Sequence, residues 1–240
     1  MDTATRATAV ALQLSANAHA LEARDDPPAG ERPRHATRLL ALIAELLQRS
    51  ETSLERLDRI AVGVGPGTFT GLRIGIATAR ALSQARGIPL VGVSTLHSLA
   101  LGAEGVLSTR PELAAVLSVL DARRGEVFVA GWAAQRLEQE ATLSARALRP
   151  DALTQLLEAS EAIQPAKTLA IGEGALAFRA ILERTGVVIP DDDFELHRVT
   201  ASNHCRLARS LPPGHPDEVH PCYLRLPDAE RPRHILAPAR

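Results

Sequence analysis

The amino-acid sequence predicts an α/β protein built of two lobes, and three observations lead to that prediction. Short apolar runs typical of strands alternate along the chain with longer runs whose apolar residues recur at helical spacing. Hydrophobic residues make up 45% of the 240 positions and charged residues 23%, which is close to the globular average and excludes a disordered chain. The charge is uneven, with a net of +2 in residues 1–100, −5 in 101–200 and +2 in 201–240, as two lobes with different surfaces would produce.

The first hundred residues alternate between strand-like and helical segments. In chain order we expect a strand at 9–14, a long helix at 36–49, a short helix that begins at the capping box of Thr52 and Glu55, a strand at 60–64, a long helix at 70–86 and a strand at 90–93. A loop is predicted at 23–34, where prolines and a glycine gather. Gly87 and Pro89 are typical of a helix end, and Ser94 or Thr95 can cap the helix that follows.

The rest of the chain predicts a hairpin followed by helices around one strand. Strands at 114–120 and 126–132 flank Asp121-Ala122-Arg123-Arg124-Gly125, which is typical of a hairpin turn. We expect further elements, in chain order, at 151–159 (helix), 168–171 (strand), 175–185 (helix), 201–211 (helix) and 219–224 (strand). The predicted domains are an N-terminal lobe over 1–104, a C-terminal lobe over 105–212, and a C-terminal strand with a proline-rich tail over 213–240.

Composition and charge exclude several classes of function. The formal net charge of −1 offers no basic field for tight autonomous nucleic-acid binding, and 2% aromatic residues offer no stacking platform for single strands. Cys205 and Cys222 are too few for a disulfide framework and predict two reduced thiols. No secretory signal follows Met1 and no apolar run is long enough to span a membrane, so a cytoplasmic location is expected.

The most distinctive motif is a glycine-rich stretch between a predicted strand and a predicted helix, Gly65-Pro66-Gly67-Thr68-Phe69-Thr70-Gly71. Such a turn can direct backbone N–H groups at an anion, but the lysine of a Walker phosphate loop is missing. The glycines equally suit a tight turn and close helix packing. Further along the helix, small residues recur every four positions and suit either an internal contact or a partner: Gly71, Gly75, Ala79 and Ser83.

No catalytic residue and no metal site are predicted. No two of the eight histidines are spaced four apart, so the paired ligands of a helical metal site are missing. A G-x-S-x-G nucleophile motif does not occur either. Asp121 beside the hairpin turn could act as a general base, but an aspartate in that place is more often a turn former.

Several blocks, in the same order along nearly the whole chain, resemble the bacterial TsaB family. They are Asp2-Thr3-Ala4-Thr5, the G-P-G-T-F-T-G-L-R-I-G run over 65–75, Gly92-Val93-Ser94-Thr95-Leu96, the D-A-R-R-G-E-V run over 121–127 and Tyr223-Leu224-Arg225. The second block is far more specific than a bare glycine pattern. The resemblance implies an ASKHA (actin-like kinase/Hsp70-type) fold with two related α/β lobes.

The resemblance also implies a function without catalysis by this chain. Members of the family are non-catalytic subunits that pair with the catalytic relative TsaD, joined by the ATPase TsaE, to place threonylcarbamoyl on the adenosine beside the anticodon of tRNA. No cofactor is expected on this chain, because ATP and metal belong to the partner subunits, and tRNA is contacted indirectly. A homodimer without TsaD is a further option. The alternatives are a small-molecule kinase of the same fold and a metallopeptidase-like enzyme.

The resemblance assigns candidate site residues to the first lobe. In the family, two long N-terminal helices form the interface with TsaD, and the corresponding residues here are His35, Leu39, Ile43, Leu46, Phe69, Leu72, Arg73, Ile76 and Arg80. A nucleotide at the subunit junction would lie near Gly65, Gly67, Thr68 and Thr70. Family members have an apolar strand directly before the Asp-Thr-Ala-Thr turn, where Met1 stands here. We therefore expect the first strand to be truncated by a start site assigned too late.

Overall fold

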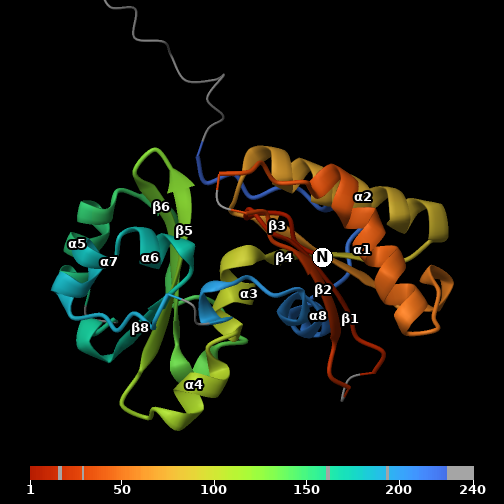
Figure 1. The fold of residues 1–240 in the computed structure, drawn as a ribbon. Coiled ribbons are helices and arrows are strands. Elements are labelled where there is room, and N and C mark those ends of the chain that lie inside the picture. Colours follow the sequence, from red (N-terminus) through yellow and green to blue (C-terminus); the bar gives the residue numbers. More distant parts are fainter. Residues whose placement is uncertain (16–17, 29, 161–162, 193–194, 226–240) are drawn as a thin grey trace, which may run out of the picture.

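Two α/β lobes lie side by side in the computed structural model, and helix α3 (Thr95–Leu101) lies between them (Figure 1). The structure describes residues 1–15, 18–28, 30–160, 163–192 and 195–225. Both lobes combine strands and helices, as the sequence predicts. None of the helices in these ranges is long and apolar enough to cross a membrane.

The first lobe contains two pairs of strands that residues 1–2 connect. β1 (Thr8–Leu12) and β2 (Leu21–Asp25) are antiparallel, and β3 (Ile60–Gly65) and β4 (Leu90–Ser94) are parallel. Asp2 exchanges backbone hydrogen bonds of 2.8 and 3.0 Å with Ala9 of β1, and the Met1 carbonyl accepts one of 2.9 Å from Gly63 of β3. Met1 and Asp2 thus connect the β1–β2 hairpin to the parallel pair β3–β4 through backbone hydrogen bonds. The truncation of a first strand stays a prediction.

Two long helices cover this lobe and confirm the helices predicted there. They are α1 (His35–Arg49) and α2 (Phe69–Arg86). Each is amphipathic and buries its apolar stripe, as Leu39 and Leu46 of α1 illustrate. Gly87 ends α2 with a φ of 64°, the left-handed conformation that glycine adopts readily at a helix end.

The second lobe is a four-stranded sheet in the order β7-β6-β5-β8. β5 (Ala115–Arg123) and β6 (Glu126–Ala133) form the predicted hairpin, β7 (Leu143–Leu148) extends it, and β8 (Thr168–Ile171) lies parallel to β5. Helices on the outer side cover this sheet in Figure 1: α5 (Pro150–Ala159), α6 (Glu173–Ala177) and α7 (Arg179–Leu182). The short α4 (Glu104–Thr109) lies at the lower end of the lobe in this view.

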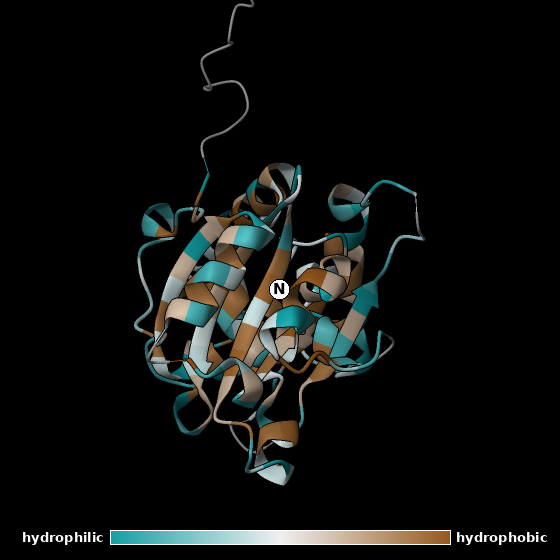
Figure 2. Ribbon diagram, turned by 90° about the vertical axis from the view of Figure 1, so that its left-hand side faces the viewer, coloured by the Kyte–Doolittle hydropathy of each residue, from teal (hydrophilic) through white to brown (hydrophobic). Residues whose placement is uncertain are grey.

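A large apolar cluster joins the two lobes. It includes Leu96 of α3, Val116 of β5 and Leu207 of α8 (Ala201–Ser210), each at most 2% exposed. Figure 2 shows hydrophobic stretches along the strands and helices that meet in the interior. α8 also packs on β1, β3 and β4, so a helix placed by prediction within 105–212 contacts the first lobe. The domain boundaries themselves stay a prediction.

Several local predictions are wrong. Phe178, at φ −118°, separates α6 from α7, so the helix predicted over 175–185 is broken. β2 begins ahead of the loop predicted at 23–34 and occupies the first residues of that range. This strand was missed because it lies at an edge with one face in water, where charged side chains hide the apolar pattern. The capping box of Thr52 does not form, since the 3₁₀ turn there starts after Ser53. β7 went unpredicted for the same reason as β2.

The segment 213–225 forms no strand, contrary to the one predicted at 219–224, and lies as a strap against α2. The Arg80 guanidinium donates hydrogen bonds to the carbonyls of Val219, at 2.8 Å, and of Asp217, at 3.2 Å. The Cys222 N–H donates to the Val64 carbonyl at 2.7 Å. Arg80 and isolated backbone hydrogen bonds therefore hold this segment in place of a regular strand ladder. The predicted tail beyond residue 225 lies outside the described residues.

The small residues of α2 serve an internal contact. The whole stripe that begins at Gly71 and ends at Ser83 is buried. The Thr3 hydroxyl donates to the Gly71 carbonyl at 2.7 Å, and a Cβ on Gly71 would overlap the Thr3 carbonyl oxygen. Of the two interpretations of this stripe, the internal contact is the one that the structure confirms.

Replacing Gly71 by Ala should therefore destabilise the fold by about 2–3 kcal/mol, because the added methyl meets backbone that cannot move aside freely. Urea unfolding of the purified variant measures this loss. Gly105→Ala in exposed α4 is the matched control: its methyl meets nothing within 4 Å, and stability should stay the same or rise by about 0.5–1 kcal/mol. Equal stabilities of the two variants would contradict the close contact.

Candidate functional site

The most concentrated polar chemistry of the molecule lies in its interior, around the carboxylate of Asp2. Its Oδ1 accepts a hydrogen bond of 2.8 Å from the N–H of Ala4, and its Oδ2 accepts one of 2.9 Å from the Thr95 hydroxyl. The Nε2 atom of His204 lies 3.0 Å from the same Oδ2. Because a carboxylate only accepts, this ring nitrogen carries the proton that faces Asp2. The cluster ties the start of the first lobe to α3 and α8.

The other side of the His204 ring faces α3. Its Nδ1 lies 2.8 Å from the Ser98 hydroxyl oxygen and 3.1 Å from the Thr200 carbonyl. Ser98, His204 and Asp2 thus stand in the order of a hydrolase relay, in which histidine passes a proton from serine and aspartate orients the ring.

This relay is closed to solvent. Ser98 and His204 are 0% exposed and Asp2 is 1% exposed, so no substrate can reach the serine oxygen. The Ser98 hydroxyl also lies 3.1 Å from the Thr200 carbonyl, to which it can donate. What this arrangement can do is hold three distant segments of the chain together.

The surroundings of Asp2 favour the charged form of its carboxyl group. Burial alone raises the pKa of this carboxyl group, but the hydrogen bond and attraction of His204, with the donors of Ala4 and Thr95, outweigh it. The pKa of Asp2 therefore lies below its ordinary value. Sequence reasoning missed this cluster, because its members are spread over the whole length of the chain. The sequence blocks include Asp2, Ala4 and Thr95, but no spacing joined them to His204.

The glycine-rich loop packs against the same N-terminal segment. Thr68 donates its N–H to the Ala4 carbonyl at 2.7 Å, and Gly67 leaves no room for a Cβ beside that carbonyl. Gly65 has a φ of 101° and lies against Leu72 and Cys222 of the strap, while Thr70 is exposed on the first turn of α2. One of the amides that could have faced an anion is thus already bonded. Nucleotide contact by this loop stays a prediction.

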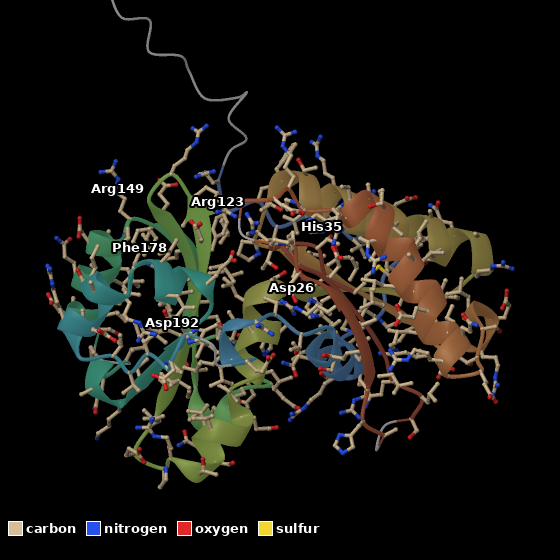
Figure 3. The ribbon with its side chains drawn as sticks, in the orientation of Figure 1. Asp26, His35, Arg123, Arg149, Phe178 and Asp192 are labelled. Carbon is tan, nitrogen blue, oxygen red and sulfur yellow. The ribbon has the colours of Figure 1, made fainter. Side chains whose placement is uncertain are left out.

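The nine residues of the predicted partner interface lie in different environments of the isolated chain. Five of its nine residues lie in the interior: His35, Leu39, Leu46, Leu72 and Ile76 are each at most 4% exposed. His35, labelled in Figure 3, faces β1, where its Nδ1 lies 2.9 Å from the Thr8 hydroxyl. Arg80 is half-buried and holds the strap. The inward stripes of α1 and α2 pack in this chain's own core, and the partner interface itself stays a prediction.

The remaining predicted residues are accessible and include an aromatic group. Phe69 and Arg73 of α2 join Tyr223 of the strap in a set that we call the α2 aromatic cluster. The Phe69 and Tyr223 rings stack with centroids 5.3 Å apart, and the Arg73 guanidinium lies 3.8 Å from the Phe69 centroid. Phe69 is 38% and Tyr223 40% exposed. Ile43 is half-buried.

The hairpin aspartate forms its turn. Asp121 Oδ1 accepts a hydrogen bond of 2.7 Å from the Arg123 N–H, and Oδ2 pairs with the Arg123 guanidinium at 3.0 Å. Arg123, labelled in Figure 3, lies at the tip of the hairpin. This confirms the turn-former interpretation. Over the described ranges, no group of three or more His, Cys, Asp or Glu side chains is placed to hold a metal ion.

Asp2→Asn should lower the free energy of unfolding at pH 7 by about 3 kcal/mol, because it leaves His204 and Thr95 without their charged acceptor. The pKa of Asp2 is lower in the folded state than in the unfolded state. The ionised carboxylate therefore stabilises the fold at pH values above the unfolded pKa, and this stabilisation is lost as the pH falls through the folded pKa. The gap between wild type and variant should therefore close below about pH 4. Urea unfolding between pH 7 and pH 3 measures the difference in the free energy of unfolding between wild type and variant.

Asp26→Asn is the matched control for that series. Asp26 is 51% exposed and pairs with Arg24 on the surface, so its loss should change stability by no more than about 0.5 kcal/mol at any of these pH values. A gap for Asp2→Asn that is equally small, or that does not depend on pH, would contradict a structural role for the buried carboxylate.

Parts of this chain are similar to proteins that are named for the biosynthesis of threonylcarbamoyladenosine in tRNA. A family model described as "TsaD: tRNA N6-adenosine threonylcarbamoyltransferase" matches residues 27–194. The Escherichia coli K12 "tRNA threonylcarbamoyladenosine biosynthesis protein TsaB" is 40% identical over 131 residues, which are 53% of this chain and 51% of that protein. The Haemophilus influenzae protein of the same name is 35% identical over 94 residues, 39% of this chain and 38% of that protein. The matches thus span about half or less of these curated relatives.

Two solved structures from Pseudomonas aeruginosa share the fold over nearly the whole chain. One is described as an uncharacterized protein with similarity to peptidase YeaZ and has a TM-score of 0.74 at 28% identity; the other, YeaZ, has 0.72 at 27%. Each comparison covers 93% of this chain and 97% of the other. The two-lobed architecture is therefore of the ASKHA type. Because the family model covers well over half of the sequence, the chain belongs to the TsaD family, and its relatives there include the TsaB proteins that the sequence blocks resemble.

Proposed function

We propose that this chain is a scaffold subunit that docks on TsaD and thereby supports the formation of threonylcarbamoyladenosine beside the anticodon of tRNA. The observation that carries the proposal is the α2 aromatic cluster, which keeps two aromatic rings exposed in a chain that has only six aromatic residues. Tyrosine, phenylalanine and arginine are enriched at protein interfaces. Leu40 of α1, 55% exposed, adds an apolar side chain on the neighbouring helix.

The chemistry of the described residues supports a role without catalysis. The one relay that resembles a hydrolase, Ser98-His204-Asp2, is closed to solvent and engaged in holding the fold together. TsaD would supply the transferase site with its metal, and TsaE would supply ATP hydrolysis. With a net charge of −1, this chain would leave most tRNA contact to its partners. In the absence of TsaD, the same exposed helices could pair two copies of the chain.

Replacing Phe69 and Tyr223 together by Ser should weaken binding to TsaD of the same organism at least about tenfold, because buried aromatic anchors dominate interface affinity. Isothermal titration calorimetry of the purified proteins measures the dissociation constant. The double variant should keep its fold, since both rings are exposed.

Leu211→Ser is the matched control. Leu211 is 37% exposed but follows α8 and is not part of the α2 aromatic cluster, so this change should leave the dissociation constant as it is. Unchanged affinity of the double variant would place the TsaD surface elsewhere on the chain, and no binding by the wild type would refute the docking role.

A further inference from the structure

The end of the strap reaches from the first lobe to the second. The Arg225 guanidinium donates a hydrogen bond of 3.0 Å to the carboxylate of Glu126, the first residue of β6. In Figure 1 the last described residues of the strap lie beside the β5–β6 hairpin. The two residues are 99 positions apart, so the pair brings together two of the sequence blocks, D-A-R-R-G-E-V over 121–127 and Tyr223-Leu224-Arg225.

The two side chains of this ion pair are largely withdrawn from water. The Arg225 side chain is 20% exposed and the Glu126 side chain 27%. Ion pairs on an open surface contribute little because water and salt screen them, and screening is weaker where the charges are partly buried. The Arg110–Glu112 pair of the same lobe illustrates the open case, with side chains 42% and 60% exposed. The Arg225–Glu126 pair is thus the better suited to hold a segment in place.

The ring of Tyr223 lies two residues before Arg225 and is held only loosely within the α2 aromatic cluster. It stacks on Phe69 from one side and is 40% exposed to solvent. Its hydroxyl oxygen accepts a long hydrogen bond of 3.3 Å from the Arg73 Nε on the exposed surface. Because these contacts leave much of the ring in water, the position of the ring depends on how the backbone of the strap is fixed.

The strap is fixed on both sides of Tyr223. Before the ring, the Cys222 N–H is bonded to the Val64 carbonyl of β3 at 2.7 Å, which belongs to the first lobe. After the ring, Arg225 is bonded to Glu126 of the second lobe. A short segment with an anchor at each end has few conformations left. The anchor from the second lobe therefore completes the placement of a ring that lies on the first.

We propose that Glu126 and Arg225 are positioning residues for docking, because their ion pair keeps the Tyr223 ring in the α2 aromatic cluster. This inference rests on the proposed docking on TsaD. A side chain that is already held in its bound position loses less conformational freedom when the partner binds, and affinity rises accordingly. The second lobe thus takes part in docking through the strap, although the rings that would meet the partner belong to α2 and the strap.

Tyr223 is the single tyrosine of the chain, so its ring can be observed directly in the isolated protein. Incorporated fluorotyrosine gives one resonance in fluorine NMR, and Phe69→Ser marks the position of the unstacked ring. In Glu126→Gln we expect the resonance to move toward that position, because Arg225 loses its charged acceptor. Glu112→Gln is the matched control: it breaks the exposed pair ahead of β5, at the other end of that strand from the hairpin, and should leave the resonance in place.

A charge swap separates the ion pair from other effects of each substitution. Glu126→Arg and Arg225→Glu should each displace the resonance, and the double variant should bring it back, since it rebuilds the pair with the charges exchanged. In titrations with TsaD, Glu126→Gln should raise the dissociation constant at least about threefold, and Glu112→Gln should leave it unchanged.

An unmoved resonance in Glu126→Gln would overturn the positioning role, even if TsaD bound more weakly, because Glu126 would then meet the partner directly. A charge swap that leaves the resonance displaced would overturn it as well. Failure of the wild type to bind TsaD would refute the docking role, and the fluorine spectra distinguish that result from a strap that the ion pair does not hold.

Discussion

The fold depends on one buried charge, the carboxylate of Asp2, and on the groups that hold it. A carboxylate removed from water is strongly unfavourable unless it is paired and hydrogen-bonded. Here a backbone N–H, a hydroxyl and an imidazole meet that requirement. Because these donors come from the N-terminal turn, from α3 and from α8, satisfying the charge fixes the relative positions of all three.

The neighbouring residues extend the same constraint. Thr3 bonds to α2, Ala4 bonds to the glycine-rich loop and Asp2 bonds to β1, so residues 2–4 connect three parts of the first lobe. The glycines of the family block are explained by this contact: they give the N-terminal segment room against α2. The motif whose pattern suggested anion binding thus allows the N-terminal segment to pack closely against the glycine-rich loop and α2. The Asp2 cluster faces inward, whereas the α2 aromatic cluster is exposed.

Much of the fold could be predicted from the sequence, because periodicity and turn residues act locally. The helices α1 and α2, the Gly87 helix end and the Asp121–Gly125 hairpin all follow from such signals. The candidate site could not be predicted in the same way. An apolar helix stripe such as that of Leu39 and Leu46 has the same pattern whether it meets a partner or its own sheet. The Asp2–His204 pair joins residues at opposite ends of the chain, and no spacing rule finds it.

The most direct measurement is the formation of threonylcarbamoyladenosine on tRNA by TsaD and TsaE, supplied with ATP and a threonylcarbamoyl donor, in the presence of this chain or of its Ser98→Ala variant. If the buried relay is structural and the chain acts by docking, the chain alone forms no product, and the folded variant supports the partners as well as the wild type does. Product from the chain alone, or loss of product with a folded Ser98→Ala variant, would contradict this account.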